Sequence, residues 1–354
     1  MADRVSIGNE VTARRRHRSR LPLDGWERGL LGLLVLLLGV LFAIVPGFWS
    51  GFGGFLALAE NFLPAGLVAL GLGTVILSGG IDLSVGSIAA LGAVIAAQAW
   101  HGLGWSIWLA SAVGVGCGAG LGLVNGLVIT RARIEPLIAT LATSFVYGSV
   151  AVALAGASPP SGFPDAFNAV GSGTLFDTPV PVQLALFAVL AVLFFFLLQR
   201  SAFGRRVRMI GYNPEAARWT GLRTDRVLLA AYVISGFMSA LAGLVLAAYY
   251  SAVRPDMGDV LLLTAITTVV LGGISIFGGE GSIAGVAIAV LLLGFLRQGM
   301  LIAGYSDMVT TMVTGAILLA AIAARNLLGD RGRFLFRLRN RLRLNRPTGD
   351  PGPR

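Results

Sequence analysis

Ser78-Gly79-Gly80-Ile81-Asp82-Leu83-Ser84-Val85-Gly86-Ser87 places a single carboxylate between two long stretches that carry no charge. Residues 61–81 before Asp82, and residues 83–130 after it, contain no Asp, Glu, Lys or Arg. About 20 apolar residues suffice for a helix to cross the hydrocarbon core of a bilayer. The stretch therefore predicts a turn between two membrane-spanning helices, with an ionisable group at membrane depth. Such a group is a candidate functional residue, although Asp82 or Ser84 could equally cap the next helix.

The same spacing of charges continues along the whole chain of 354 residues, of which 56% are hydrophobic and 12% charged. Soluble domains carry about 25% charged residues, so this composition excludes an ordinary soluble fold. We expect an all-α polytopic membrane protein with about ten transmembrane helices. The runs with few or no charges, of which the one between Glu280 and Asp307 is interrupted by Arg297, place these helices near residues 29–49, 58–79, 85–100, 105–129, 136–155, 180–199, 227–250, 259–277, 283–303 and 308–324.

The positions of the arginines predict the orientation in the membrane. All 27 basic residues are arginine, and with the N-terminus inside they gather in residues 14–18, 131–133, 200–226 and the tail after Arg325, which leaves Arg254 on the outside. Cytoplasmic loops carry the excess of positive charge, so we expect both termini in the cytoplasm. The chain then divides into a basic tail (1–28), a transmembrane domain (29–325) and a second basic tail (326–354). Orientation and contact with anionic lipid explain the net charge of +10 without a nucleic-acid partner.

Residues for several kinds of chemistry are scarce. Because the chain has no lysine, the phosphate-binding loop G-x-x-x-x-G-K-[ST] is absent, and any ATP-Mg would be used by another chain. Cys117 is the single cysteine, and His17 and His101 are the two histidines, so a zinc site of the usual N/S type cannot be built. We therefore expect no catalytic residues, cofactor or metal, and not an enzyme but a passage without its own energy source.

Polar residues in or near the expected helices are the candidates for a translocation path or gate. Polar side chains inside spans usually face a water-filled cavity or another helix. Arg297 could line such a path or extend its guanidinium to the membrane surface. The candidates are Asn61, Asp82, Ser84, Asn125, Arg297 and Gln298.

Two connections between the expected helices, residues 200–226 and 156–180, are long enough to receive a partner. In residues 200–226, Asn213 as N-cap, Pro214 as first helical residue and Gly221 as stop predict a helix of about two turns on the cytoplasmic side. This helix could dock a soluble partner or merely lie at the membrane surface, and composition alone favours the second. The proline-rich external loop 156–180 could likewise receive a partner or simply connect two spans.

Two glycine-rich turns suggest an internal duplication. Thr74-Val75-Ile76-Leu77 with Gly79-Gly80-Ile81 resembles Thr268-Val269-Val270-Leu271 with Gly272-Gly273-Ile274. Both turns join an inward-running helix to an outward-running one, and many transporters are built from such repeats. Two unrelated glycine-rich hairpins could also show this much similarity by chance.

Four blocks, in order, resemble the permease subunit of bacterial binding-protein-dependent ABC importers for ribose, xylose, arabinose and galactose. They are Gly80–Ser87, Val124–Leu127 with Pro136–Leu141, Phe203–Arg205 with Asn213–Gly221, and Gly272–Ser282, within a similarity that covers Phe62–Ala323. Leu137 stands where that family more often has Phe, and Trp219 and Thr220 replace the common Leu and Ser. These departures leave the class intact and the substrate open.

The resemblance implies a subunit of the bacterial inner (plasma) membrane that translocates a monosaccharide, either a pentose or a hexose. A separate ATPase subunit would power it, a periplasmic sugar-binding protein would supply it, and two permease chains, identical or different, would form one passage. Alternatives are a nucleoside or sugar-like signalling molecule as substrate, or a stand-alone facilitator. The resemblance assigns coupling to the ATPase to Asn213, Pro214, Glu215, Ala216, Ala217, Arg218 and Gly221.

Overall fold

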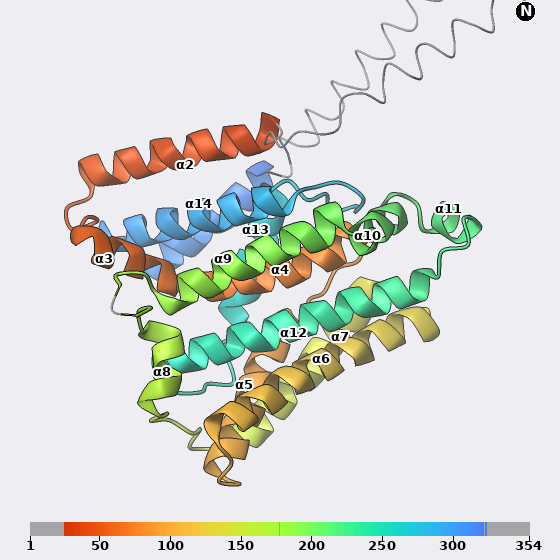
Figure 1. Cartoon of the computed structure of the whole chain (residues 1–354), viewed down its shortest axis with the longest axis horizontal. Helices are drawn as coiled ribbons and strands as arrows, with labels where there is room; N and C mark the ends of the chain where they lie inside the picture. The colour runs from red at the N-terminus through yellow and green to blue at the C-terminus, as the bar shows by residue number, and fades with distance from the viewer. Residues whose placement is uncertain (1–24, 177, 322, 324–354) are drawn as a thin grey trace, which may run out of the picture.

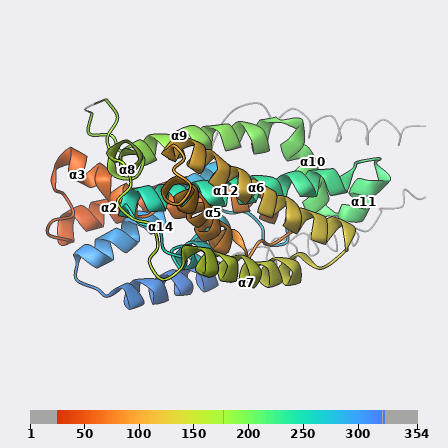
Figure 2. The ribbon, with the colours of Figure 1, turned by 90° about the horizontal axis from the view of Figure 1, so that it is seen from below.

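The computed structural model describes residues 25–176, 178–321 and 323, and within them helices form the regular structure. Extended backbone pairs there only as two isolated bridges, Ser161–Ala252 and Thr174–Pro181. Most of the long helices run roughly along one direction and form a bundle (Figures 1 and 2). The predicted all-α class is confirmed. Nearly all of the two predicted basic tails, and the end of the last predicted helix, lie outside the described residues.

Every apolar segment predicted from the sequence contains a helix. In chain order the elements are α2 (Gly25–Ile44), α3 (Gly51–Ala57), the 3-10 turn η1 (Leu58–Asn61), α4 (Leu63–Leu77), α5 (Val85–His101), α6 (Ile107–Arg131), α7 (Pro136–Ala155), α8 (Asp165–Ser172), α9 (Val182–Phe195), the π-helical turn η2 (Phe196–Arg200), α10 (Ala202–Tyr212), α11 (Pro214–Trp219), α12 (Thr224–Tyr250), α13 (Asp259–Leu271), α14 (Ile283–Ile302) and a last helix, Asp307–Ala321.

The helices differ in how much of a membrane they can cross. Among the described residues, six helices are long and apolar enough to span it, and the bent pair Gly51–Asn61 with α4 raises this to seven. Three further apolar helices are shorter: α5, α13 and Asp307–Ala321. The chain is therefore a multi-pass membrane protein in which three of the ten predicted segments fall short of a full span.

Three predicted boundaries were wrong, each for a local reason. The first helix ends at Ile44 rather than at residue 49, because Pro46 disfavours helical backbone in the residue before it. The segment predicted at 58–79 is bent by 49° between Asn61 and Leu63, where Pro64 opens α4. The segment predicted at 259–277 ends at Leu271, where two glycines follow.

Two short helices lie in segments predicted as loops. α10 precedes the predicted cytoplasmic helix, and its buried residues Gly204, Val207 and Ile210 alternate with arginines. α8 occupies part of the external loop 156–180. It buries Phe167, whose ring lies 5.1 Å from that of Phe163. Both helices gain their stability by packing, which the apolar-run criterion does not detect.

α12 occupies the centre of the bundle and packs against α4, α5, α6 and α8 (Figure 1). Its contact with α6 is made through glycine, since a Cβ added at Gly118 or Gly122 would approach the carbonyl oxygens of Gly236 or Tyr232 closer than 3.0 Å. Small residues allow helix backbones to approach closely in lipid. The α6–α12 pair forms a tight support for the polar side chains that lie beside it.

Candidate functional site

The segment after η2, which was predicted to lie on the cytoplasmic side, folds into two short helices joined at Asn213. Ser201 caps α10 by accepting a hydrogen bond from the Gly204 amide, at 3.2 Å. Asn213 leaves the helical conformation, and its Oδ1 accepts a hydrogen bond from the Ala216 amide at 2.9 Å. Pro214 then begins α11, and Gly221 follows its end with φ +80°. The predicted cap, first residue and stop of this helix are confirmed.

Some side chains of α11 are exposed, and others contact the rest of the chain. Ala217 is buried, whereas Glu215 is exposed and Trp219 is 84% exposed. The Arg218 guanidinium is turned back, because its Nε donates to Thr224 Oγ1 at 3.2 Å and its Nη2 lies 3.9 Å from Asp225 Oδ1. Glu215 and Trp219 are therefore among the exposed side chains of α11, and Trp219 was not among the predicted coupling residues.

α10 is fastened to the turn between α13 and α14. Arg208 Nη2 donates to the Gly281 carbonyl at 3.1 Å, and Tyr212 Oη lies 3.5 Å from Glu280 Oε1. Just before α10, Gln199 Nε2 donates to Ser282 Oγ at 2.6 Å. A displacement of α10 would pull directly on residues 280–282.

The end of α10 also lies between two turns that are far apart in sequence. A Cβ added at Gly211 would approach Leu77 O and Gly279 N closer than 3.0 Å. The Gly279 amide itself donates to Leu77 O, at 2.9 Å. The backbones of residues 77–80, 211 and 278–279 thus meet at one point, which we call the glycine junction. Only glycine at position 211 leaves room for this approach.

The turn that follows α4 and the turn that follows α13 have the same hydrogen-bonding pattern, although only the first of them lies at the glycine junction. After α4, Gly79 N donates to Ile76 O and Gly80 N to Val75 O. After α13, Gly273 N donates to Val270 O and Ile274 N to Val269 O, which is the same Schellman motif. Gly79 and Gly273 take its left-handed position, with φ +85° and +93°. The shared motif supports the predicted duplication. It pairs Gly79 with Gly273, whereas the sequence comparison had paired Gly79 with Gly272.

A buried network surrounds Asp82, whose side chain is 0% exposed. Asp82 Oδ1 accepts from the Ser84 amide (3.0 Å) and the Ser84 hydroxyl (2.6 Å), and Oδ2 accepts from Ser235 Oγ of α12 (2.8 Å). Asn125 Nδ2 of α6 donates to Ser84 Oγ at 2.7 Å, and Tyr147 Oη of α7 donates to Asn125 Oδ1 at 3.1 Å. The network ties the α4–α5 turn to three other helices.

The backbone of the same turn is held from its sides. Thr140 Oγ1 of α7 accepts from the Leu83 amide at 3.1 Å, and Tyr232 Oη of α12 donates to the Ile81 carbonyl at 3.4 Å. Asp82, Ser84 and Asn125 were predicted and come together here. The sequence analysis missed four residues that hold this turn, because each lies dozens of residues from Asp82 in sequence and only the tertiary fold brings it close. They are Thr140, Tyr147, Tyr232 and Ser235.

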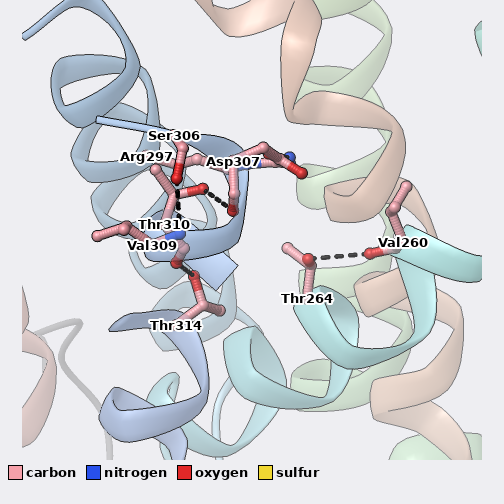
Figure 3. A network of polar contacts seen from close by, with 8 residues as sticks. All are labelled: Val260, Thr264, Arg297, Ser306, Asp307, Val309, Thr310 and Thr314. Atoms are coloured by element: carbon pink, nitrogen blue, oxygen red, sulfur yellow. Dashed lines mark hydrogen bonds and ion pairs between the residues drawn. The ribbon is translucent and has the colours of Figure 1, made fainter. Parts of the chain in front are cut away.

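The other predicted path residues lie elsewhere. Asn61 Oδ1 accepts from Tyr249 Oη at 3.1 Å, and Gln298 is buried within α14. Arg297 Nη2 pairs with Asp307 Oδ1 at 2.5 Å. Figure 3 shows this pair beside Ser306 and Thr310 at the start of the last helix, with Thr264 of α13 on the other side of the view. These three residues do not join the Asp82 network.

No group of three His, Cys, Asp or Glu residues within the described part of the chain is placed to hold a metal ion. The arrangement instead offers mechanical contacts. A protruding helix is joined through α10 to the α4–α5 connection and to residues 278–282 of the α13–α14 connection, and the first of these is anchored by the Asp82 network. Such an arrangement can transmit movement of α11 into the bundle.

Comparison with known proteins identifies the class. A family profile described as "Branched-chain amino acid transport system / permease component" matches residues 54–322. The autoinducer 2 import system permease protein LsrD of Klebsiella pneumoniae is 38% identical over 308 residues, which is 85% of this chain and 92% of the relative. LsrD of an Enterobacter species is 39% identical over 85% of this chain and 93% of the relative. LsrD of Yersinia enterocolitica is 38% identical over 86% of this chain and 92% of the relative. No solved structure matches significantly.

The family match runs from α3 to the last helix and leaves out α2, and the matches relate the chain to transport permeases rather than to enzymes. They confirm the resemblance to sugar-type ABC importer permeases that the sequence blocks indicated. The chain belongs to the family of membrane permease components of import systems.

Proposed function

We propose that the chain is the transmembrane subunit of a bacterial inner-membrane ABC importer for a sugar or a sugar-like molecule. Its ATPase would be a separate subunit that uses ATP-Mg, a periplasmic binding protein would deliver the substrate, and a second permease chain would complete the passage. The named relatives support a sugar-like signalling molecule of the autoinducer-2 kind as the first candidate substrate. A monosaccharide is the second candidate.

We also propose ten membrane segments with both termini in the cytoplasm. The arginines of residues 200–226 and of the two tails then lie on the cytoplasmic side, as the distribution of positive charge requires. Residues 29–325 form the permease domain in this arrangement. α11 faces the cytoplasm, and α8 with the α12–α13 connection faces the outside.

One observation supports the coupling role most directly: α11 protrudes while α10 is held at the glycine junction. The ATPase would receive Glu215 and Trp219 in a groove, and closure of its two domains would push α10. Because α10 contacts Leu77 and Gly279 together, the push would reach the α4–α5 and α13–α14 turns at once. Alternating access of a path by small shifts of packed helices is a known mode of conformational change.

The double variant Glu215→Gln/Trp219→Ala is expected to lose association with the ATPase at least tenfold while it inserts normally. Neither change touches the packing of α10, since both side chains are exposed. Co-purification of the ATPase from native membranes in mild detergent, followed by mass spectrometry, measures the effect. Trp108→Ala is the matched control, because Trp108 is also exposed (56%) but lies at the start of α6 on the opposite side.

Two results would contradict the proposal. Unchanged uptake and unchanged ATPase recovery in the double variant would remove the coupling assignment. Solute flux by the isolated chain in lipid vesicles, without ATP or an ATPase, would make a stand-alone facilitator the better description. Uptake of labelled autoinducer 2, ribose and a nucleoside by the complete importer distinguishes the candidate substrates.

A further inference from the structure

α13 is too short to reach the outer surface. Its 13 residues extend about 20 Å, against about 30 Å of hydrocarbon core. Its end lies level with the start of α2, because Trp26 Nε1 donates to the Leu271 carbonyl at 2.9 Å. α2 has 20 residues and extends about 30 Å. In the proposed orientation, α13 therefore begins about 10 Å below the outer end of α2.

A second contact gives the same depth independently. Gly258, just before α13, packs on Gly86 in the first turn of α5, and a Cβ added at either glycine would approach the other's backbone closer than 3.0 Å. One turn further along α5, Ala89 packs in the same way on Gly243 of α12. Gly243 lies seven residues, or about 10 Å, before the end of α12 at Tyr250. Gly258 is at least that far inside.

The connection between α12 and α13 therefore descends into the outer half of the bundle. Ser251 and Val253 still pair with the external loop, through Gly162 N to Ser251 O at 2.8 Å and Val253 N to Pro160 O at 3.1 Å. Within the next six residues the chain descends to Gly258 and Asp259. Connections that leave helical structure at membrane depth are tolerated where they are buried in protein or line a water-filled cavity.

The descending segment is charged and exposed. Arg254 Nε donates to Asp256 Oδ1 at 3.0 Å, and their side chains are 69% and 54% exposed. Asp259, in the first turn of α13, is exposed as well. An ionised side chain facing lipid at the centre of a membrane-spanning helix costs about 2.5–3.5 kcal/mol or more. Asp259, next to Gly258 at the depth derived above, therefore favours contact with water, and the Arg254–Asp256 pair lies above it.

We propose that residues 254–259 and the adjoining exposed face of α13, with Val260 and Thr264, form one wall of a water-filled vestibule that opens to the outside. The vestibule receives an uncharged, hydroxyl-rich solute, for which the Arg254–Asp256 pair supplies donors and acceptors, while Asp259 disfavours anions. This proposal rests on the proposed function as an importer and names the place where the solute enters.

Accessibility of single cysteines to a membrane-impermeant methanethiosulfonate reagent tests this proposal. The reagent is added from outside to right-side-out vesicles that contain the complete importer, with Cys117→Ser as background to remove the native thiol. Asp259→Cys and Val260→Cys probe the vestibule. Ser161→Cys in the external loop is the accessible reference. Val189→Cys is the lipid-facing control, because Val189 is 67% exposed in the middle of the apolar helix α9.

We expect Asp259→Cys and Val260→Cys to react within about tenfold of the rate of Ser161→Cys, and Val189→Cys to remain unmodified. Val260→Cys keeps the test valid if the Asp259 variant does not assemble. Two outcomes overturn the vestibule: both probes stay unmodified while Ser161→Cys reacts, or Val189→Cys reacts as fast as they do. Uptake by the same vesicles before labelling tests the importer separately, so that failure of one proposal is distinguishable from failure of the other.

Discussion

Gly211→Ala is expected to reduce uptake at least tenfold while the chain still reaches the membrane and still binds the ATPase. The added Cβ would meet Leu77 O on one side and Gly279 N on the other, and both are backbone atoms that no rotamer change can move. Alanine gains about 1 kcal/mol of helix propensity over glycine. Overpacking a tight contact costs about 1–3 kcal/mol, so the junction opens or shifts.

The measurement compares substrate uptake with the ATPase activity of the purified complex. We expect ATPase activity in Gly211→Ala to persist but to respond no longer to the loaded binding protein, because α11 is still presented while its link to the two turns is displaced. Gly120→Ala in α6 is the matched control, since a Cβ there meets no atom within 4 Å apart from the backbone of its own helix. Uptake and stimulation of Gly211→Ala within twofold of the wild type would exclude the glycine junction as the transmission route.

Asp82→Ala is expected to destabilise the assembled bundle by about 2–4 kcal/mol. Three donors lose their acceptor: the Ser84 amide, the Ser84 hydroxyl and the Ser235 hydroxyl. A buried donor left unsatisfied costs about 1–3 kcal/mol. Hydrogen bonds between helices in membranes average only about 0.6 kcal/mol, since hydroxyls find alternative partners. The estimate of about 2–4 kcal/mol lies between the sums that these two costs give for three donors. A loss of this size lowers the thermal midpoint of unfolding by about 5 °C or more.

Size-exclusion chromatography of detergent extracts after heating measures this midpoint. Asp82→Asn keeps one acceptor oxygen and the side-chain volume, so its midpoint should lie between those of the wild type and Asp82→Ala. Ser144→Ala is the control, because that hydroxyl donates to the Leu141 carbonyl of its own helix. A wild-type midpoint in Asp82→Ala would show that the network does not anchor the turn, and would leave Asp82 free for a role in the path.

The sequence predicted the helical segments well because lipid imposes a simple rule on it. Charged residues are excluded from lipid-facing positions, so the uncharged runs mark α6, α7 and α12 with boundaries within a few residues, and an apolar run interrupted only by Arg297 marks α14. The rule failed where local backbone chemistry decided, as at Pro46, at Pro64 and at Gly272. It also missed α8 and α10, which are short and depend on tertiary packing.

The coupling segment shows both sides of this limit. Asn213, Pro214 and Gly221 mark the start and stop of α11, because capping is local and these residue types have few alternatives. That Trp219 protrudes while Arg218 turns back to Thr224 depends on how α11 leans on α12, and no local pattern reports it.

By itself, therefore, the sequence determined the all-α membrane class, the helical segments and the family, because hydropathy and motifs are properties of neighbouring residues. Only the tertiary structure decided that Gly211 contacts two distant connections, that Asp82 lies in a network with Ser235 and Tyr147, and that Gly258 before α13 packs on Gly86 of α5. These features arise from contacts between segments about 70–150 residues apart in the sequence. Such contacts are set by the packing of whole helices, so no short stretch of sequence records them.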